Sequence, residues 1–128
     1  MKPSLFITAA SILVFTGTLN AQTKTFELTG LWKNETKQHE YHFKADSSMV
    51  FTQSGYQAFI NSYTVDFTKS PAWLDMTMSV GDRQLVTPAL LKIINENEII
   101  IEQFPPGSEH PVEFSDNEYT QVKLVRQQ

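Results

Sequence analysis

Between residues 27 and 126, apolar and polar side chains alternate over short runs that are separated by polar turn residues. In residues 38–45, for example, Tyr41 and Phe43 occupy one parity, whereas charged residues and a histidine occupy the other. A period of two places alternate side chains on opposite faces of a β-strand. The runs recur roughly every dozen residues, and no segment has a helical period long enough to use, so the sequence predicts an all-β fold.

Asp, Ser, Asn, Gly and Pro lie between these runs, as they do in tight turns. They divide the region into eight predicted strands. These strands are residues 27–34, 38–45, 49–53, 57–68, 73–80, 84–95, 98–104 and 119–126. Short connections in sequence order favour one antiparallel up-and-down meander, either closed as a barrel or folded as a sandwich. A closed eight-stranded barrel is the preferred prediction because closure removes two exposed sheet edges.

The first 21 residues have the layout of a secretory signal peptide. Lys2 supplies a positive start, residues 5–15 are mostly apolar, and Ala21 is a small residue at the expected cleavage point. The alternative, an N-terminal membrane anchor, needs an apolar run of ~20 residues, and this run is shorter. The sequence therefore predicts a signal peptide (residues 1–21), one barrel domain (residues 22–128), no membrane anchor after cleavage, and a periplasmic or secreted location.

The charge balance and the absence of cysteine narrow the possible partners. The chain has 10 Lys and Arg against 14 Asp and Glu, a net charge of −4. Cleavage after residue 21 removes only Lys2 among these, which leaves 9 against 14 and a net charge of −5. An acidic chain without a basic run disfavours nucleic acid and anionic membranes as partners. Without cysteine, the chain can form neither disulfides nor zinc–thiolate sites.

Gly30-Leu31-Trp32 near the start of the predicted barrel and Arg126 near its end predict how the barrel closes. The first and last strands of a closed meander must meet. We expect the Trp32 ring to lie across the end of the barrel there, with the Arg126 guanidinium stacked on it. Gly30 has no side chain, and it therefore permits a sharp bend or the close approach of another group.

These residues resemble a motif of the lipocalin-like superfamily of small barrels, in which a Gly-x-Trp on the first strand is covered by an Arg from the last. A closer resemblance is to a family of small, uncharacterised bacterial lipocalin-like domains. It rests on Tyr63-Thr64-Val65-Asp66, Pro71, Leu74-Asp75, Gly81, residues 90–94, Pro111 and Phe114. That family tends to have an Arg just before the loop Pro, where this chain has His110, so any ion pair of that Arg is in question here. The resemblance implies the barrel fold, and lipocalin relatives typically carry small apolar ligands inside the barrel.

Binding of a small hydrophobic ligand is the first functional hypothesis. An eight-stranded barrel is just wide enough to be filled by its own side chains or to hold one small ligand. The candidate ligand-binding residues, chosen as inward-facing apolar side chains, are Phe43, Phe51, Tyr63, Val65, Leu74, Met76 and Met78. The alternative is a filled barrel that acts as a protein-interaction module, through its acidic surface or through the irregular stretch 105–118.

The sequence predicts no catalytic set, no cofactor and no metal site. His39 and His42 point to opposite faces of one strand, so they cannot bind one ion together. The turn at residues 69–71 brings Asp66 and Asp75 onto neighbouring strands, where a carboxylate pair could perform acid–base chemistry. The competing interpretation is structural: both carboxylates lie on polar rows or accept hydrogen bonds from turn amides. An enzyme using this pair at the barrel mouth is therefore the third hypothesis.

Overall fold

The computed structural model describes residues 26–128, so the predicted signal peptide lies outside the described residues. This part of the chain forms nine strands and no helix. The strands are β1 (Gly30–Asn34), β2 (His39–Phe43), β3 (Met49–Gln53), β4 (Tyr56–Ile60), β5 (Ser62–Asp66), β6 (Ala72–Val80), β7 (Arg83–Asn95), β8 (Glu98–Gln103) and β9 (Gln121–Arg126). All pairings between them are antiparallel, so the predicted all-β antiparallel fold is confirmed.

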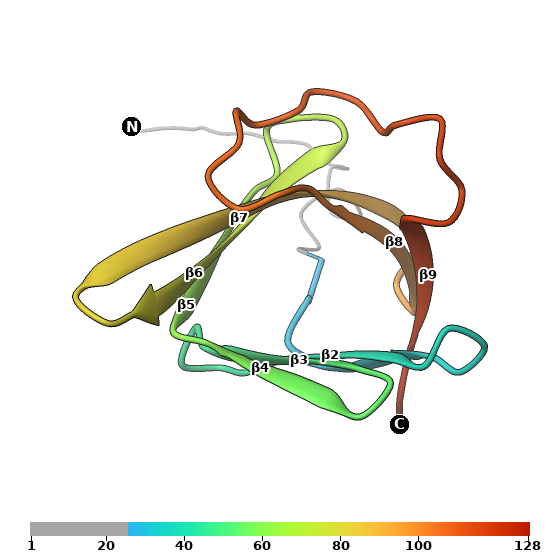
Figure 1. The fold of residues 1–128 in the computed structure, drawn as a ribbon. Helices are drawn as coiled ribbons and strands as arrows, with labels where there is room; N and C mark the ends of the chain where they lie inside the picture. Colours follow the sequence, from blue (N-terminus) through green and yellow to red (C-terminus); the bar gives the residue numbers. More distant parts are fainter. Residues whose placement is uncertain (1–25) are drawn as a thin grey trace, which may run out of the picture.

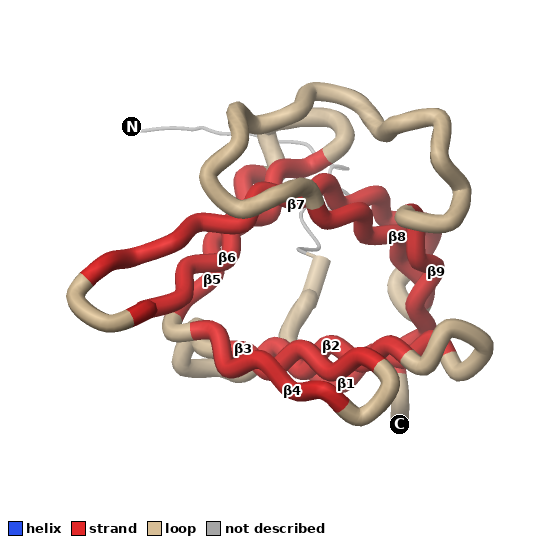
Figure 2. Tube along the Cα trace, in the orientation of Figure 1, coloured by secondary structure: helices blue, strands red, loops and turns tan. Residues whose placement is uncertain are grey.

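The strands form one sheet that curls into a nearly closed barrel (Figure 1, Figure 2). Their order across the sheet is β4-β3-β2-β1-β9-β8-β7-β6-β5. Apart from the pair of β1 and β9, every paired strand lies beside a neighbour in sequence. In the exceptional pair, Trp32 lies opposite Arg126 and Lys33 lies opposite Val125. The first and last strands of the meander therefore meet as predicted.

The barrel has nine strands instead of the predicted eight because the predicted strand 57–68 is divided at Asn61. β4 pairs with β3, whereas β5 pairs with β6, so one bent segment supplies both edges of the sheet. Ile60 of β4 lies opposite the buried Met49, and Tyr63 of β5 lies opposite the buried Met76. The inward parity thus changes from even to odd numbers, as an extra residue in the bend requires.

Hydrogen bonds around Asn61 hold the two edges near each other. The Asn61 amide donates to the Thr77 carbonyl oxygen at 2.9 Å, and Asn61 Oδ1 accepts from the Ser79 amide at 2.7 Å. On the other side of the bend, the Tyr63 amide donates to the Ser47 carbonyl oxygen at 2.9 Å. The barrel therefore closes at the bend, while β4 keeps one edge with no partner strand in the described sheet.

Large side chains pack against one another in the barrel interior. Tyr41 stacks on Phe43 with ring centroids 5.9 Å apart and meets Phe51 at 4.9 Å. Phe43 in turn meets the ring of Tyr63 edge-on at 5.0 Å. The core consists of Leu28, Trp32, Tyr41, Phe43, Met49, Ile60, Ala72, Leu74, Met76, Ala89, Leu91, Ile99, Ile101, Val122 and Leu124. On β8 the odd-numbered isoleucines face inward, which the sequence pattern left open.

The predicted contact between Trp32 and Arg126 closes one end of the barrel. Trp32 is fully buried, and its indole Nε1–H donates to the Leu28 carbonyl oxygen at 2.8 Å. The Arg126 guanidinium carbon lies 4.3 Å from the centroid of the Trp32 ring. Gly30 has a φ of +135°, and a Cβ there would lie 3.4 Å from Arg126 Nη1. Glycine therefore provides both the backbone conformation and the space for the guanidinium.

A second, smaller packed region lies outside the barrel, where the long connection between β8 and β9 crosses the strands (Figure 1). Leu90 is fully buried although its neighbours Ala89 and Leu91 belong to the interior core. Nearby on β6, the Trp73 ring stacks on His110 of the connection, with centroids 4.0 Å apart and planes 8° apart. The connection is thus docked on the outer face of the barrel.

Glu102 on β8 anchors this connection. Its side chain is 1% exposed, accepts from the Ser115 amide at 2.9 Å and from Thr120 Oγ1 at 2.5 Å, and also accepts a hydrogen bond from Ser115 Oγ. Burial by itself raises the pKa of the Glu102 carboxyl, but these hydrogen bonds outweigh burial and hold its pKa below the usual value. Glu102 is therefore a buried carboxylate stabilised by hydroxyl and amide donors.

Candidate functional site

The seven predicted ligand-binding residues all belong to the inner packing of the barrel. Phe43, Leu74 and Met76 are buried in the core, and the other four are partly buried and pack against it. Of the seven, only Phe51 also lines one of the surface hollows described below. The structure therefore brings these residues together, in mutual contact.

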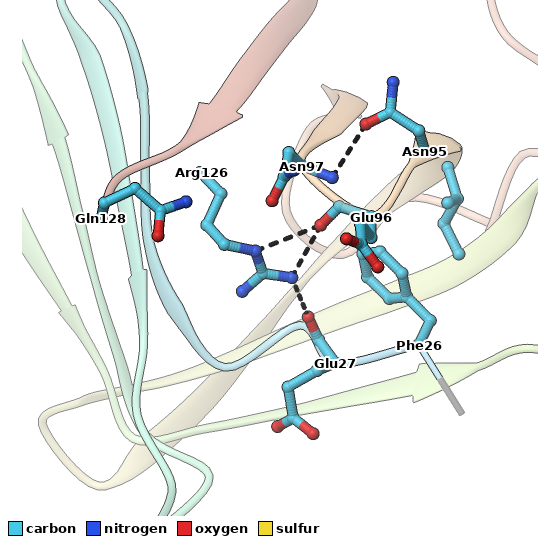
Figure 3. A pocket seen from close by; sticks show the side chains of 8 residues that line it. Phe26, Glu27, Asn95, Glu96, Asn97, Arg126 and Gln128 are labelled. Atoms are coloured by element: carbon cyan, nitrogen blue, oxygen red, sulfur yellow. Dashed lines mark hydrogen bonds between the residues drawn. The ribbon is translucent and has the colours of Figure 1, made fainter. Parts of the chain in front are cut away.

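A hollow of about 620 Å³ lies outside the end that Trp32 and Arg126 close (Figure 3). Its apolar walls include Phe26 and Ile93. The Arg126 guanidinium reaches this hollow but donates to three backbone carbonyl oxygens: Glu96 at 3.0 and 3.1 Å, Glu27 at 2.5 Å, and Thr29 at 3.1 Å. The guanidinium donors are thus used in hydrogen bonds to the protein backbone. The hollow is therefore not an anion site built on Arg126.

The opposite end of the barrel contains a smaller hollow of about 230 Å³. Its wall includes Phe51 and Tyr119, and its polar groups include a hydrogen bond of 2.6 Å from Gln103 Nε2 to the Tyr41 hydroxyl. Burial raises the pKa of Tyr41, partly offset by that bond, so the phenol stays protonated. We call this hollow the mouth cup.

His39 is the unusual residue of the mouth cup. Its ring meets Phe51 edge-on at 5.6 Å, and its buried Nδ1 has no hydrogen-bond partner in the described chain. Burial, and then the charge of Lys37, hold the pKa of His39 below its usual value, so the ring is neutral near pH 7. The sequence predicts only that His39 and His42 cannot bind one metal ion together, and it assigns His39 to no other site. Its shared parity with Tyr41 and Phe43 could have placed it at the barrel mouth.

Exposed apolar side chains gather on β4 and on the hairpin of β6 and β7. On β4, Tyr56 is 69% and Phe59 is 68% exposed. On the hairpin, Val80 and Val86 are exposed as well. The hairpin extends well beyond the barrel wall (Figure 1). These side chains leave apolar surface available for contact with another molecule.

The two carboxylates of the enzyme hypothesis each have a separate partner. Asp66 accepts from the Thr68 amide at 2.9 Å and from its hydroxyl at 2.5 Å, and these bonds lower the pKa of Asp66. Asp75 Oδ1 lies 3.3 Å from His110 Nε2. Asp66 therefore takes part in a local turn, whereas Asp75 contacts the long connection between β8 and β9.

Two further features of the described chain bear on function. Within residues 26–128, no three His, Asp or Glu side chains gather closely enough to hold a metal ion. The same residues include no helix with the length and apolarity needed to cross a membrane.

Together, the antiparallel sheet, the bent segment between β4 and β5 and the Trp32–Arg126 contact define the described chain as a small, nearly closed β-barrel. No family model matches the sequence, and no curated protein or solved structure matches it significantly.

Proposed function

We propose that this protein is an exported lipocalin-like barrel that works as a protein-interaction module through its outer surface. The observation that carries the proposal is the packing of the interior. The side chains that would line a ligand cavity instead contact one another, as in the stack of Tyr41 on Phe43 and the edge contact of Phe43 with Tyr63. A ligand site of ordinary size needs about 300–1,000 Å³ of space between such residues.

The exposed aromatic residues on β4 support the same proposal. Single exposed apolar side chains are common on protein surfaces, but this five-residue edge strand exposes a large aromatic ring on each of its two faces, Tyr56 on one and Phe59 on the other. Aromatic side chains are enriched among the residues that dominate binding energies at protein interfaces. Burying one Phe-sized side chain against a partner contributes about 1.5–3 kcal/mol. Tyr56 and Phe59 are therefore the residues that we expect to contact a partner.

The test compares two double variants of the chain from residue 22 onward. Tyr56→Ser with Phe59→Ser removes the β4 aromatics, and Val112→Ser with Tyr119→Ser removes two side chains of similar exposure from the long connection. Each is used to capture proteins from the exported fraction of the natural host, after circular dichroism has shown that it is folded. We expect a partner retained by the wild type and the control but lost with the β4 variant. Equal capture by both variants would contradict the proposal.

A second candidate function, binding of a small neutral molecule in the mouth cup, is favoured by the unpartnered Nδ1 of His39. A buried polar atom without a partner costs about 1–3 kcal/mol, which a ligand that hydrogen-bonds to it would recover. Native mass spectrometry of protein from its natural host tests this candidate. A bound small molecule that disappears with Phe51→Ala would favour the mouth cup over the interaction module.

A further inference from the structure

We infer that a second copy of this chain pairs with the free edge of β4, strand to strand and antiparallel, with Ala58 on the two-fold axis. The inference deepens the proposed function and rests on it, because it names the partner of the β4 surface. Three features carry it: the direction of the free backbone groups of β4, the absence of charge on β4 and the residues around it in sequence, and the lack of a partner strand on this side of β4.

The hairpin of β3 and β4 determines which backbone groups are free. Ser54 and Gly55 form its two-residue turn, with φ of +50° and +88°, and Gln53 pairs with Tyr56. In such a hairpin the closing pair exchanges both backbone hydrogen bonds, and bonding then alternates along the strand. The groups of residues 56, 58 and 60 therefore face β3. Those of Gln57 and Phe59 point away from it, toward the side on which the Asn61 amide meets Thr77.

The edge lacks the features that prevent sheets from pairing. Soluble proteins protect edge strands with lysine, proline, bulges or inward charges. β4 has the sequence Tyr-Gln-Ala-Phe-Ile, without a charge or a proline. From Ser47 to Val65, between Asp46 and Asp66, no residue is charged. No other run without charge is as long among residues 26–128.

This neutrality favours a second copy as the occupant. The predicted mature chain has a net charge of −5, so most of its surface repels another copy. The neutral run allows the β4 strands of two copies to approach without placing like charges opposite each other, whereas a strongly basic partner would find no carboxylate on β3 or β4. The edge therefore offers no electrostatic attraction to a strongly charged partner. It suits an uncharged strand, and β4 of a second copy is such a strand.

The neighbouring hairpin leaves room for the second copy. β6 meets the bend that follows β4, where the Asn61 amide donates to the Thr77 carbonyl oxygen, and the hairpin of β6 and β7 then extends away from the barrel wall (Figure 1, Figure 2). β6 comes close to β4 near its Ile60 end, but no described strand pairs with the β4 edge from Tyr56 to Phe59. A β4–β4 pair would extend the sheet of one barrel into that of the other.

The free groups specify one register. Antiparallel pairing of Gln57 with Phe59 of the second copy, and of Phe59 with its Gln57, uses both free amides and both free carbonyls on each side. Ala58 then lies directly opposite Ala58 of the second copy. Five-residue strands bury little area, well below the ~1,200 Å² of stable interfaces, so we expect a transient dimer with a dissociation constant of about 10 μM to 1 mM.

Cysteine cross-linking tests this register, because the chain has no cysteine of its own. Two cysteines form a disulfide only when their Cα atoms lie within about 7 Å. Ala58→Cys fulfils this across the axis. Tyr56 lies on the same strand and face as Ala58, and it is 69% exposed. In this register, however, Tyr56 of one copy is several residues away from Tyr56 of the other, so Tyr56→Cys cannot form the disulfide. We expect Ala58→Cys to form disulfide-linked dimers at least tenfold faster than Tyr56→Cys under mild oxidation. Equal rates, or a faster Tyr56→Cys, would overturn the inference.

Two blocking changes provide the matched control. Gln57→Pro removes an edge amide that β3 does not use, and Phe59→Lys places a lysine at the edge. Added to Ala58→Cys, either change should reduce cross-linking to the Tyr56→Cys rate, whereas Val112→Lys on the long connection should not. If Gln57→Pro fails to fold, Phe59→Lys still decides the outcome, and undiminished cross-linking in a folded Phe59→Lys variant refutes the inference.

The two proposals fail in different ways. If Ala58→Cys remains monomeric but partner capture still depends on Tyr56 and Phe59, the second copy is the wrong occupant and the proposed function stands. If Ala58→Cys cross-links as expected but capture is independent of both aromatics, the β4 pairing stands and the broader function as an interaction module fails.

Discussion

Arg126 links three parts of the chain that are distant in sequence. Its guanidinium covers Trp32 and donates to carbonyl oxygens of the segment before β1 and of the turn between β7 and β8. It has no carboxylate partner among the hydrogen bonds of the described chain, so carbonyl dipoles and the aromatic face solvate the charge. One residue therefore substitutes for a covalent link between the chain ends in a protein without cysteine.

At this residue scale, we expect Trp32→Ala to lower the free energy of unfolding by about 3–5 kcal/mol, because it empties a fully buried site. Arg126→Ala should cost less, about 1–2 kcal/mol, through the loss of stacking and of hydrogen bonds to exposed chain ends. Urea unfolding followed by far-UV circular dichroism measures both. A neutral Trp32→Ala would show that the ring does not support the barrel.

At the scale of elements, the long connection between β8 and β9 is part of the folded structure although it contains no strand. Glu102 binds its residues Ser115 and Thr120, and Trp73 of β6 stacks on its His110. Composition alone identifies this stretch as irregular. The stretch is attached through Glu102 on the outer face of β8. In the alternating pattern Glu102 looks like an ordinary exposed polar residue, so the sequence does not predict the attachment.

We expect this attachment to weaken in acid. The folded-state pKa of Glu102 is lowered, so its contribution to stability is present above the pKa of an unfolded Glu, ~4.3, and is lost as the pH falls through the lower folded-state value. Glu102→Gln should therefore be less stable than the wild type at pH 7, with the difference shrinking below about pH 4. Hydrogen exchange of the connection at both pH values measures this. A difference that does not change with pH would contradict the assigned role.

At the scale of the whole molecule, the barrel and the outer packed region share the same strands. β6 and β7 place residues in the interior on one face and contact the long connection on the other, as Leu91 and Leu90 illustrate. Loss of either packed region therefore removes support from the other.

We accordingly expect a single cooperative unfolding transition. The two tryptophans report on the two regions, since Trp32 lies in the interior and Trp73 lies against the connection. In Trp73→Phe and in Trp32→Phe, the fluorescence of the remaining tryptophan should follow the same urea midpoint as the circular dichroism of that variant. An earlier transition for Trp73 alone would show that the connection detaches before the barrel opens.

The sequence by itself determined the local conformation and the meeting of the first and last strands. A two-residue period specifies strands wherever one face is buried. Gly30 and Trp32 near the first strand, with Arg126 in the last, predicted that these two strands meet. The seven predicted ligand-binding residues were placed together for the same reason, because parity decides which face a side chain takes.

Only the tertiary structure decided how the two halves of the sheet join, how full the interior is, and which edge stays open. Parity says that a side chain faces inward, but not how much space separates it from the opposite wall. The change of parity at Asn61 is invisible locally because β4 and β5 are each regular, and their different partners are distant in sequence. The position of His39 at the mouth and the free edge of β4 follow from the same long-range pairing, which no local pattern encodes.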